Sequence, residues 1–526
     1  MAALVSGRSL LTSFALIISS AVAIPSPATN TACRALAVAV PGRVTFPGEP
    51  AYATENADYW NVGLRTDLPA CITLPESTEE VSTIVKTLGR HPRAIFVVKS
   101  GGHDPNPNHS QIPDGIVVAM KKIKGATYSS VANVAFVKPG GPWADVLTSL
   151  EDSGVAVVGG RLGVVGIGGY LTQGGLSFLG AQYGLAATNI RAFKTVLPNG
   201  TIANITPESN KDLMTAMRGS GAQFGIVTEF TMDAHKIGQV WGGMRIFTAN
   251  NAATIFKGLH SFIANGDPKA AIITNAMTVG GQQLYMVFYF YDGAIPPAGT
   301  FFELEKPFPL LNQVKTQSYP ALLAANGVGV NATGSSASFR SITLPYLNDI
   351  PEVYSLINDQ WMKILAPYFT TVTGLTTTIA YQPLQASLAQ ASAGRGGSAM
   401  GLTATDGHRF ILEINCLWTN PSQSDIVYAF SRELTDWVEK QLPTWKTLQA
   451  QRAVLTPAGS AAGASAALAR KVEDYVPLFA NDATGDQDVL GSYKDVAKFA
   501  ALQKQMDPQG LFAKSGGFKF GPALRG

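Results

Sequence analysis

Two glycine-rich segments of the chain contain the residue types that a large polar ligand requires. A buried strand predicted over residues 94–98 runs directly into Lys99-Ser-Gly-Gly-His103, which presents His103 at the tip of a loop. Glycine lets a backbone turn sharply and approach a ligand without interference from a Cβ atom. Taken alone, this motif is more often an ordinary surface turn, so its interpretation depends on the second glycine-rich segment.

Residues 159–184 form this second segment, which is the most glycine-dense part of the chain. So many glycines between apolar residues would be costly in backbone entropy if they served only as connectors. They favour a backbone that wraps a polar ligand and offers N–H groups to a pyrophosphate. The spacing does not match a G-x-G-x-x-G that opens a βαβ unit, which argues against a Rossmann site.

Together these segments resemble the FAD-linked oxidases of the berberine-bridge-enzyme-like group, whose FAD-binding fold is of the vanillyl-alcohol-oxidase or PCMH type. The resemblance covers about residues 67–237 and returns at 479–512, in Phe-Ala-Asn-Asp, Gly-Ser-Tyr and Asp-Pro-Gln-Gly-Leu-Phe. It implies that FAD is bound covalently, through its 8α-methyl group, to His103. It also implies a wider set of cofactor-binding residues: Ser100, Gly101, Gly102, Pro139, Gly140, Gly141, Gly166, Gly168, Gly169, Gly174, Gly175, Tyr183, Gly184, Leu185, Asn189, Gly225, Ile226, Val227 and Asn481.

Three positions depart from the pattern of this family. Leu162 stands where many members have a Cys that forms a second flavin bond, so the expected attachment is through His103 alone. Asp482 replaces a Tyr to which sugar-oxidising relatives give a proton-abstracting or substrate-facing role, which makes a sugar alcohol a weaker substrate candidate. Tyr170 replaces a frequent His.

Glu413 is the main candidate for acid–base catalysis, and Asp482 and Tyr183 are the other catalytic candidates. Glu413 lies in a strand-like run, residues 408–418, that resembles the family's strand facing the flavin. By alternation Ile411, Glu413 and Asn415 share one face of this strand. A carboxylate near an apolar flavin face would have a raised pKa and could accept a proton. The alternative for Glu413 is a carboxylate paired with an Arg or facing water, and for Asp482 and Tyr183, as for Trp418 and Tyr493, a packing role.

The elements that position these residues alternate short strands and helices from about residue 69. Ser77 and Glu80 predict the start of a helix, a second helix is expected over 143–152, and Pro-Asn-Gly at 198–200 predicts a hairpin. After residue 237, strand-like runs alternate with long helical segments such as 426–442. The expected fold is α+β, a PCMH-type FAD-binding domain with an inserted substrate domain built on an antiparallel sheet.

At 526 residues the chain is expected to contain more than one domain. The predicted boundaries are a signal peptide (1–23), an N-terminal arm (24–62), the FAD-binding domain (63–237), the substrate domain (238–470) and a C-terminal segment that returns to the FAD-binding domain (471–526). Residues 455–470, rich in Ala, Gly and Ser, suit either a mobile link or a helix start.

The N-terminus has the three-part layout of a secretory signal peptide, with an anchor helix as the alternative. Arg8 precedes an apolar run, and small residues at 21 and 23 suit a cleavage site. Export to an oxidising compartment would let Cys33 and Cys71 pair, whereas Cys416 is expected to be a buried small hydrophobe. Sequons at Asn108, Asn199, Asn204 and Asn331 are candidates for glycans in a secreted protein.

Composition narrows the possible partners. A formal charge of +3, without a basic cluster interleaved with aromatics, argues against nucleic acid. No Cys/His spacing resembles a metal site. The expected partners are a small-molecule substrate and molecular oxygen, with no membrane after signal cleavage.

The sequence therefore predicts an FAD-dependent oxidase that takes hydride from a small organic substrate. A fungal-type secondary metabolite such as a polyketide or alkaloid is favoured, because of the single His link and the missing Tyr. Two alternatives stay open: a carbohydrate oxidase, and a pericyclase or binding protein in which flavin is structural.

Overall fold

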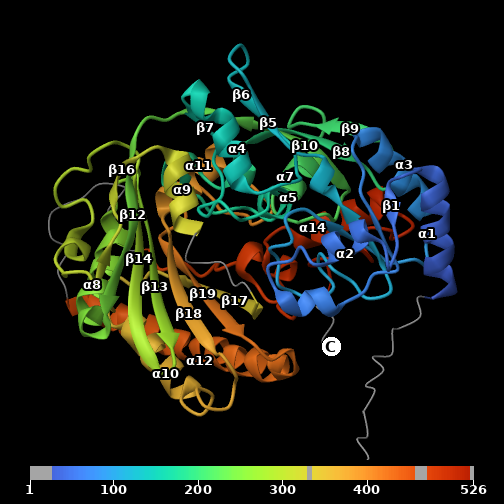
Figure 1. Ribbon diagram of the computed structural model, residues 1–526. Helices are drawn as coiled ribbons and strands as arrows, with labels where there is room; N and C mark the ends of the chain where they lie inside the picture. The colour runs from blue at the N-terminus through green and yellow to red at the C-terminus, as the bar shows by residue number, and fades with distance from the viewer. Residues whose placement is uncertain (1–25, 328–333, 456–470, 522–526) are drawn as a thin grey trace, which may run out of the picture.

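The computed structural model describes residues 26–327, 334–455 and 471–521. It has the expected α+β architecture, with one large antiparallel sheet beside a domain of smaller sheets (Figure 1). The predicted signal peptide, the sequon at Asn331 and most of the Ala/Gly/Ser-rich stretch lie outside the described residues.

Two main sheets organise the N-terminal domain. The first has the order β1-β2-β4-β3, in which β2 and β3 are parallel to β4 and β1 is antiparallel to β2. The second has the order β5-β6-β10-β8-β9 and is antiparallel, and β7 pairs with β11 beside it. The strands are β1 (Val44–Thr45), β2 (Cys71–Thr73), β3 (Phe96–Lys99), β4 (Ile116–Ala119), β5 (Ala126–Ser129), β6 (Val134–Val137), β7 (Val155–Ala156), β8 (Ile190–Val196), β9 (Ile202–Ile205), β10 (Ile226–Asp233) and β11 (His235–Lys236). The hairpin predicted around residues 198–200 is β8–β9.

Two helices of this domain, α3 and α7, begin at a residue whose side chain caps the helix. At α3, the Ser77 side chain accepts a hydrogen bond from the Glu80 N–H, as predicted for an N-cap. The Glu80 carboxylate accepts from the Glu76 N–H, one residue before the N-cap. The helices are α3 (Thr78–Gly89), α4 (Trp143–Leu150), α5 (Ile167–Thr172), α6 (Gly180–Tyr183) and α7 (Lys211–Met217).

The segment expected as an N-terminal arm is instead folded into two helices, α1 (Pro27–Ala39) and α2 (Pro50–Asn56). Its composition suggested an extended arm, but the apolar residues of α1 repeat at helical spacing, and Ala32, Cys33 and Leu36 are buried in one core with residues of α3 and β4. A disulfide joins Cys33 to Cys71 at the start of β2. The pairing that the sequence left open is therefore present, and it fixes α1 to the first sheet.

The substrate-domain sheet has eight strands in the order β15-β12-β14-β13-β18-β19-β17, with β16 also paired to β12, and its neighbours are antiparallel. Its long strands are rich in β-branched and aromatic residues, which suit a pleated, buried surface. The strands are β12 (Val240–Thr248), β13 (Ala270–Val279), β14 (Gln282–Tyr291), β15 (Leu311–Asn312), β16 (Lys315–Gln317), β17 (Ser336–Pro345), β18 (Thr376–Leu384) and β19 (Arg409–Trp418).

The two faces of this sheet have different neighbours. The helices α8 (Ala252–Asn265), α10 (Val353–Leu365) and α12 (Ser424–Leu455) cover the outer face in Figure 1. The residues that they bury form one core with alternate residues of the strands. The opposite face turns toward the N-terminal domain, where α9 (Tyr319–Gly327) and α11 (Ala386–Gly394) also lie (Figure 1).

The C-terminal segment lies against the N-terminal domain, where α14 (Val496–Met506) is drawn in red in Figure 1. The Asp507 carboxylate accepts hydrogen bonds from the N–H groups of Leu511, Phe512 and Ala513. This turn places the Phe512 ring edge-on against Phe96 of β3, with ring centroids 5.3 Å apart. The end of the chain thus supports the strand that leads to His103.

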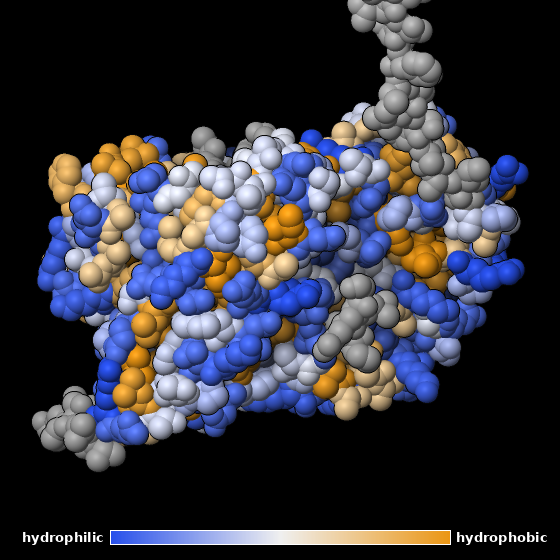
Figure 2. All heavy atoms as spheres, turned by 90° about the horizontal axis from the view of Figure 1, so that it is seen from below, coloured by the Kyte–Doolittle hydropathy of each residue, from blue (hydrophilic) through white to orange (hydrophobic). Residues whose placement is uncertain are grey.

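On the face shown in Figure 2, hydrophilic residues surround separate apolar patches. Within the described ranges, no helix is both long and apolar enough to cross a bilayer. Within the same ranges, no group of three or more His, Cys, Asp and Glu side chains has the geometry to hold a metal ion.

Candidate active site

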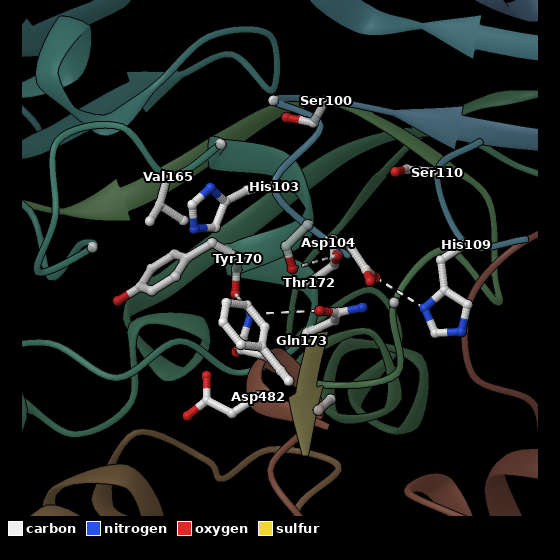
Figure 3. Close-up of a pocket in the computed structure, with 18 of the residues that line it drawn as sticks. Ser100, His103, Asp104, His109, Ser110, Val165, Tyr170, Thr172, Gln173 and Asp482 are labelled. Carbon is white, nitrogen blue, oxygen red and sulfur yellow. Dashed lines mark hydrogen bonds and ion pairs between the residues drawn. The ribbon is translucent and has the colours of Figure 1, made fainter. Parts of the chain in front are cut away.

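A cavity of about 390 Å³ lies between the N-terminal domain and the inner face of the large sheet. Three parts of the chain contribute to its lining: the glycine-rich loops of the N-terminal domain, the strands β13, β14, β18 and β19, and the C-terminal segment. Figure 3 shows His103 and Asp482 toward one side of this cavity, with His109 toward the other.

His103 reaches the cavity because the loop after β3 makes unusually close backbone contacts. A Cβ atom on Gly101 would lie 2.4 Å from the Cα of Gly166, and Gly102 has a φ of +64°. Only glycine fits these two conditions without strain. The Ser100 hydroxyl fastens the loop by donating to the Pro139 carbonyl and accepting from the Gly168 N–H.

The His103 imidazole is packed against aromatic rings. The Trp60 indole lies over it with centroids 4.7 Å apart, and Phe339 of β17 lies 6.3 Å away. Burial lowers the pKa of His103 to about 4, and the charge of the neighbouring Asp104 opposes this effect. The imidazole is therefore neutral at physiological pH, which leaves one ring nitrogen with a free lone pair.

Two sets of contacts hold the backbone on either side of His103. Before it, the buried Lys99 ammonium pairs with Glu55 of α2 at 2.6 Å. After it, the Asn61 side chain donates to the Pro105 carbonyl and accepts from the Ala337 N–H of β17. The Asn106 side chain donates to Ala483 O in the C-terminal segment. The loop thus connects all three parts of the chain that line the cavity.

Two carboxyl groups, Glu413 of β19 and Asp482 of the C-terminal segment, face the cavity together. Both accept hydrogen bonds from the Nε2 of Gln382 on β18, at 2.9 and 2.7 Å. The Arg161 guanidinium donates to Oε1 of the same glutamine. Gln382 therefore bridges the guanidinium and both acids.

Burial raises the pKa of both acids. The pKa of Glu413 lies well above its usual range because of burial and then the charge of Asp482, while Arg161 opposes both effects. Burial also raises the pKa of Asp482, against the opposing influences of Arg161 and the Gln382 hydrogen bond. A carboxyl pair whose pKa values are raised in this way holds its protons more tightly than exposed carboxyl groups do.

Most of the residues predicted from the sequence line this cavity. Those that do are His103, Ser100, Gly101, Gly102, Pro139, Gly166, Gly168, Gly169, Gly225, Ile226, Val227, Asn481, Asp482 and Glu413. Those that do not are Gly140, Gly141, Gly174, Gly175, Tyr183, Gly184, Leu185 and Asn189. Several of the second group support the first: Gly175 N–H, for example, donates to the side chain of Asn481.

The proposed catalytic and cofactor-binding role of Tyr183 is not supported by its position. Its ring stacks on His235 of β11 with centroids 3.7 Å apart, outside the cavity. Asn189 fixes the same turn by donating to the carbonyls of Tyr183 and Leu185, and its Oδ1 contacts the His235 imidazole. This segment fits a framework role, because its polar groups are satisfied by one another.

Sequence reasoning missed Trp60, Arg161 and Gln382. Trp60 lies in the segment interpreted as an arm. Arg161 lies among glycines that were interpreted only through their backbone N–H groups, so its side chain was not considered. Gln382 lies in a strand that the sequence analysis did not predict, and alternation along residues 376–384 would have placed it on one face with Ala380. The residues at 219–223 and 515–518 that line the cavity were not assigned either.

The lining fits FAD. Gly169, Gly221 and Gly517 line the cavity, and a Cβ atom added to any of them would meet no atom within 4 Å. Bare backbone therefore faces open space there, as a closely bound ligand requires. Trp60 and Ser110 also line the cavity, and their Nε1 and Oγ atoms are buried without a hydrogen-bond partner in the described part of the chain. Such groups are suited to a polar ligand.

The chain is similar in sequence to known FAD-binding proteins. Residues 69–206 match the FAD binding domain model. An uncharacterized FAD-linked oxidoreductase of Arthroderma benhamiae is 30% identical over 486 residues, covering 91% of this chain and 92% of the relative. The FAD-dependent monooxygenase drtC of Aspergillus calidoustus is 27% identical over 502 residues, covering 91% and 88%.

The fold agrees with solved structures. The Physcomitrella patens BBE-like 1 protein superposes with a TM-score of 0.65 at 18% identity, covering 94% of this chain and 98% of that one. Cavity, glycine loops and relatives all agree with the resemblance seen in the sequence. The chain belongs to the family of FAD-linked oxidoreductases and is an enzyme of that class, and its fold is that of a berberine-bridge-enzyme-like protein.

Proposed function

We propose that this enzyme is an oxidase that carries FAD covalently on His103 and oxidises a secondary metabolite such as a polyketide or alkaloid. The observation that carries the proposal is the shared cavity. A neutral imidazole on a glycine loop and a hydrogen-bonded carboxyl pair line the same space. Attachment is through His103 alone, because the neighbouring position at which many relatives have a Cys is Leu162.

The residues that would hold the cofactor are those of the cradle around His103: Ser100, Gly101, Gly102, Gly166, Gly168, Gly169, Gly225, Ile226, Val227 and Asn481. When bound, FAD supplies two-electron oxidation of a substrate C–H bond, with molecular oxygen as the final acceptor and hydrogen peroxide as the product. Gly169, which has no atom within 4 Å of its missing Cβ, leaves room beside the loop for a planar ring system.

The protein contributes the proton transfer. Glu413 is the proposed base, because it lies on the strand that faces the cavity and its carboxyl group is positioned by Gln382. A base with a pKa raised toward the working pH combines a useful ionised fraction with a strong affinity for the proton. Asp482, bonded to the same amide nitrogen, is the proposed second member of the acid–base pair.

The cavity floor supports an apolar substrate. The inner face of the large sheet presents Ile273 and Met277 of β13, Met286 and Phe288 of β14, and Leu417 of β19, beside the polar side chains of Asn275, Thr376, Thr378 and Asn415. Apolar lining with a few polar groups favours a small molecule with a hydrophobic ring system and a reacting hydroxyl or amine. The Asp at position 482, where sugar-oxidising relatives have Tyr, supports the same choice.

Secretion is part of this proposal. The Cys33–Cys71 disulfide supports an oxidising compartment. The asparagines of three sequons, Asn108, Asn199 and Asn204, are exposed and so accessible to glycosylation. The signal peptide predicted over residues 1–23 would provide the export signal that such a route requires.

The test is acid denaturation of the purified mature protein. Flavin absorbance and fluorescence are expected to stay with the polypeptide and to map to the peptide that contains His103. The variant His103→Ala is expected to lose the acid-stable flavin. Flavin that washes away from the wild-type protein would contradict the covalent bond, and a protein purified without any flavin would contradict the proposal as a whole.

A further inference from the structure

The carboxamide of Gln382 is the centre of the polar cluster at the cavity. Its Oε1 accepts from the Arg161 guanidinium, and its Nε2 donates to Glu413 and to Asp482. An amide nitrogen has two N–H groups, so this arrangement uses both donors and assigns one to each carboxyl group.

Arg161 decides which way this amide points. An amide rotated by half a turn would place its oxygen against two carboxyl groups and its N–H groups against a guanidinium, which has only donors. The guanidinium therefore fixes Gln382 in the one orientation that serves both acids.

The four side chains come from separate parts of the chain, so the cluster exists only in the assembled molecule. Gln382 and Glu413 lie on the same face of neighbouring strands, because Ala380 is the residue directly opposite Glu413. Asp482 comes from the C-terminal segment. Arg161 comes from the glycine-rich loop before α5, two positions after Gly159.

We propose that Arg161 and Gln382 are positioning residues that hold Glu413 and Asp482 as a pair sharing one proton. One carboxyl group then meets the substrate as a base while the other is an acid. This inference rests on the proposed function of the same site. In the step, the substrate O–H or N–H bond breaks, a carboxyl O–H bond forms, and the C–H electron pair leaves as hydride to the family's flavin. The extra proton then returns to solvent.

The charged and titratable groups around the pair agree with one shared proton. Arg161 is the cation that faces both acids, and it lowers the pKa of each against the effect of burial. Tyr170 of α5 faces Asp482 and Arg161, and burial raises its pKa well above its usual range, so it stays neutral. Tyr319 of α9 faces Arg161 and is neutral for the same reason. One cation beside two acids favours one negative charge on the pair.

The experiment compares Arg161→Met, Arg161→Lys and Gln382→Met with the wild-type enzyme loaded with flavin. The matched control is Gln385→Met, which removes a buried amide that contacts helix carbonyls outside this cavity. The first readout is infrared absorption of protonated carboxyl groups as a function of pH, assigned with Glu413→Gln and Asp482→Asn. The second is the pH dependence of anaerobic flavin bleaching by substrate.

Arg161→Met and Gln382→Met are expected to move both the infrared midpoint and the acid limb of bleaching upward by about one pH unit. At pH values below the acid limb, a shift of this size lowers the bleaching rate by about tenfold. Arg161→Lys keeps the positive charge, so its infrared midpoint and acid limb are expected to lie closer to those of wild type. The control Gln385→Met is expected to give the same midpoint and limb as wild type.

Infrared midpoints that are the same in Arg161→Met, Gln382→Met and wild type would overturn the inference. So would two carboxyl groups that both ionise near their ordinary values. Failure of the proposed function has a different signature: no candidate substrate bleaches the wild-type flavin, while the infrared titration still decides the state of the pair.

Discussion

Trp60 is the side chain that most directly limits the motion of His103. Its indole lies 4.7 Å from the imidazole and 5.1 Å from the ring of Phe339, which is itself 6.3 Å from the imidazole, so the three rings form one cluster. Its backbone N–H donates to the Gly102 carbonyl, which ties the same residue to the loop. Trp60 thus restricts the imidazole through both its ring and its backbone.

Removal of this ring is expected to impair covalent attachment. An aromatic pair contributes about 0.5–1.5 kcal/mol, so Trp60→Ala is expected to lower the rate of acid-stable flavin formation by about two- to tenfold. Trp60→Phe is expected to retain most of the rate. The measurement is flavin fluorescence in denatured protein over time after addition of FAD. A matched control is Trp241→Ala, since Trp241 stacks on Phe301 away from the cavity; equal losses in both alanine variants would contradict a specific role.

Glu413 leads to a prediction about stability and pH. Because burial raises its pKa in the folded protein, the carboxyl group ionises more readily in the unfolded chain, where the value is close to 4.5. Its contribution to stability is therefore greatest below that value and is lost as pH rises through the folded pKa. Glu413→Gln is expected to melt higher than wild type by about 1–3 °C at pH 8 and to match it at pH 4. Thermal melts of the flavin-free forms test this, and a difference that grows toward acid pH would contradict the assigned direction.

The sequence supported a prediction of His103 and Glu413, but the contacts around them could not be predicted. His103 follows a buried strand and two glycines, and Glu413 lies in an alternating strand, but it was the resemblance of both segments to the family that pointed to their roles. Arg161 and Gln382 are 221 residues apart along the chain, and Gln382 and Asp482 are 100 apart, so only the tertiary fold brings these side chains together. No local pattern specifies such contacts. For Tyr183, the neighbouring residues match the family motif, whereas its ring stacks on His235 outside the cavity, a position that the motif does not predict.

At the scale of elements, the glycines of the two glycine-rich segments, the loop after β3 and residues 159–184, have two different structural roles. Gly101 and Gly166 allow two backbones to touch, because a Cβ on either would lie within 2.6 Å of the other residue. Gly169 borders open cavity instead, with no atom within 4 Å of its missing Cβ.

Among the elements, β3, α3 and the β8–β9 hairpin could be predicted from the sequence. The helices α1 and α2 were missed because a Pro- and Ala-rich composition hid their helical spacing.

These two kinds of glycine are expected to respond differently to alanine. Gly101→Ala must displace the loop or Gly166, and it is expected to lower stability by about 1–3 kcal/mol even without flavin. Gly169→Ala is expected to leave the flavin-free protein as stable as wild type and to slow the formation of acid-stable flavin by about tenfold or more. Gly238→Ala is the control, since it has open space and lies outside the cavity. Denaturant unfolding and the rate of acid-stable flavin formation distinguish these cases, and equal stability of Gly101→Ala and Gly169→Ala would contradict the distinction.

At the scale of the whole molecule, the cavity is a product of chain topology. The chain leaves the N-terminal domain after β11, builds the large sheet, and returns with Asp482 and residues 515–518. The acid–base pair, the apolar floor and the His103 loop therefore face one another only when both domains are folded and docked. Each domain alone lacks part of the site, so substrate choice depends on what the sheet presents to the loop.

The apolar floor leads to a prediction about substrate choice. Burying about 100 Å² of apolar ring surface stabilises a complex by about 2.5 kcal/mol, which hydroxylated sugar rings of the same size cannot match. Phenolic or polyketide alcohols are therefore expected to bleach the flavin anaerobically at least about tenfold faster than oligosaccharides at equal concentration. The double variant Met277→Asn and Phe288→Asn replaces two floor residues of the inner face and is expected to reduce that ratio without loss of acid-stable flavin. Robust turnover of oligosaccharides with none of the aromatic alcohols would instead make this enzyme a carbohydrate oxidase, with the polar groups beside Gln382 as its binding site.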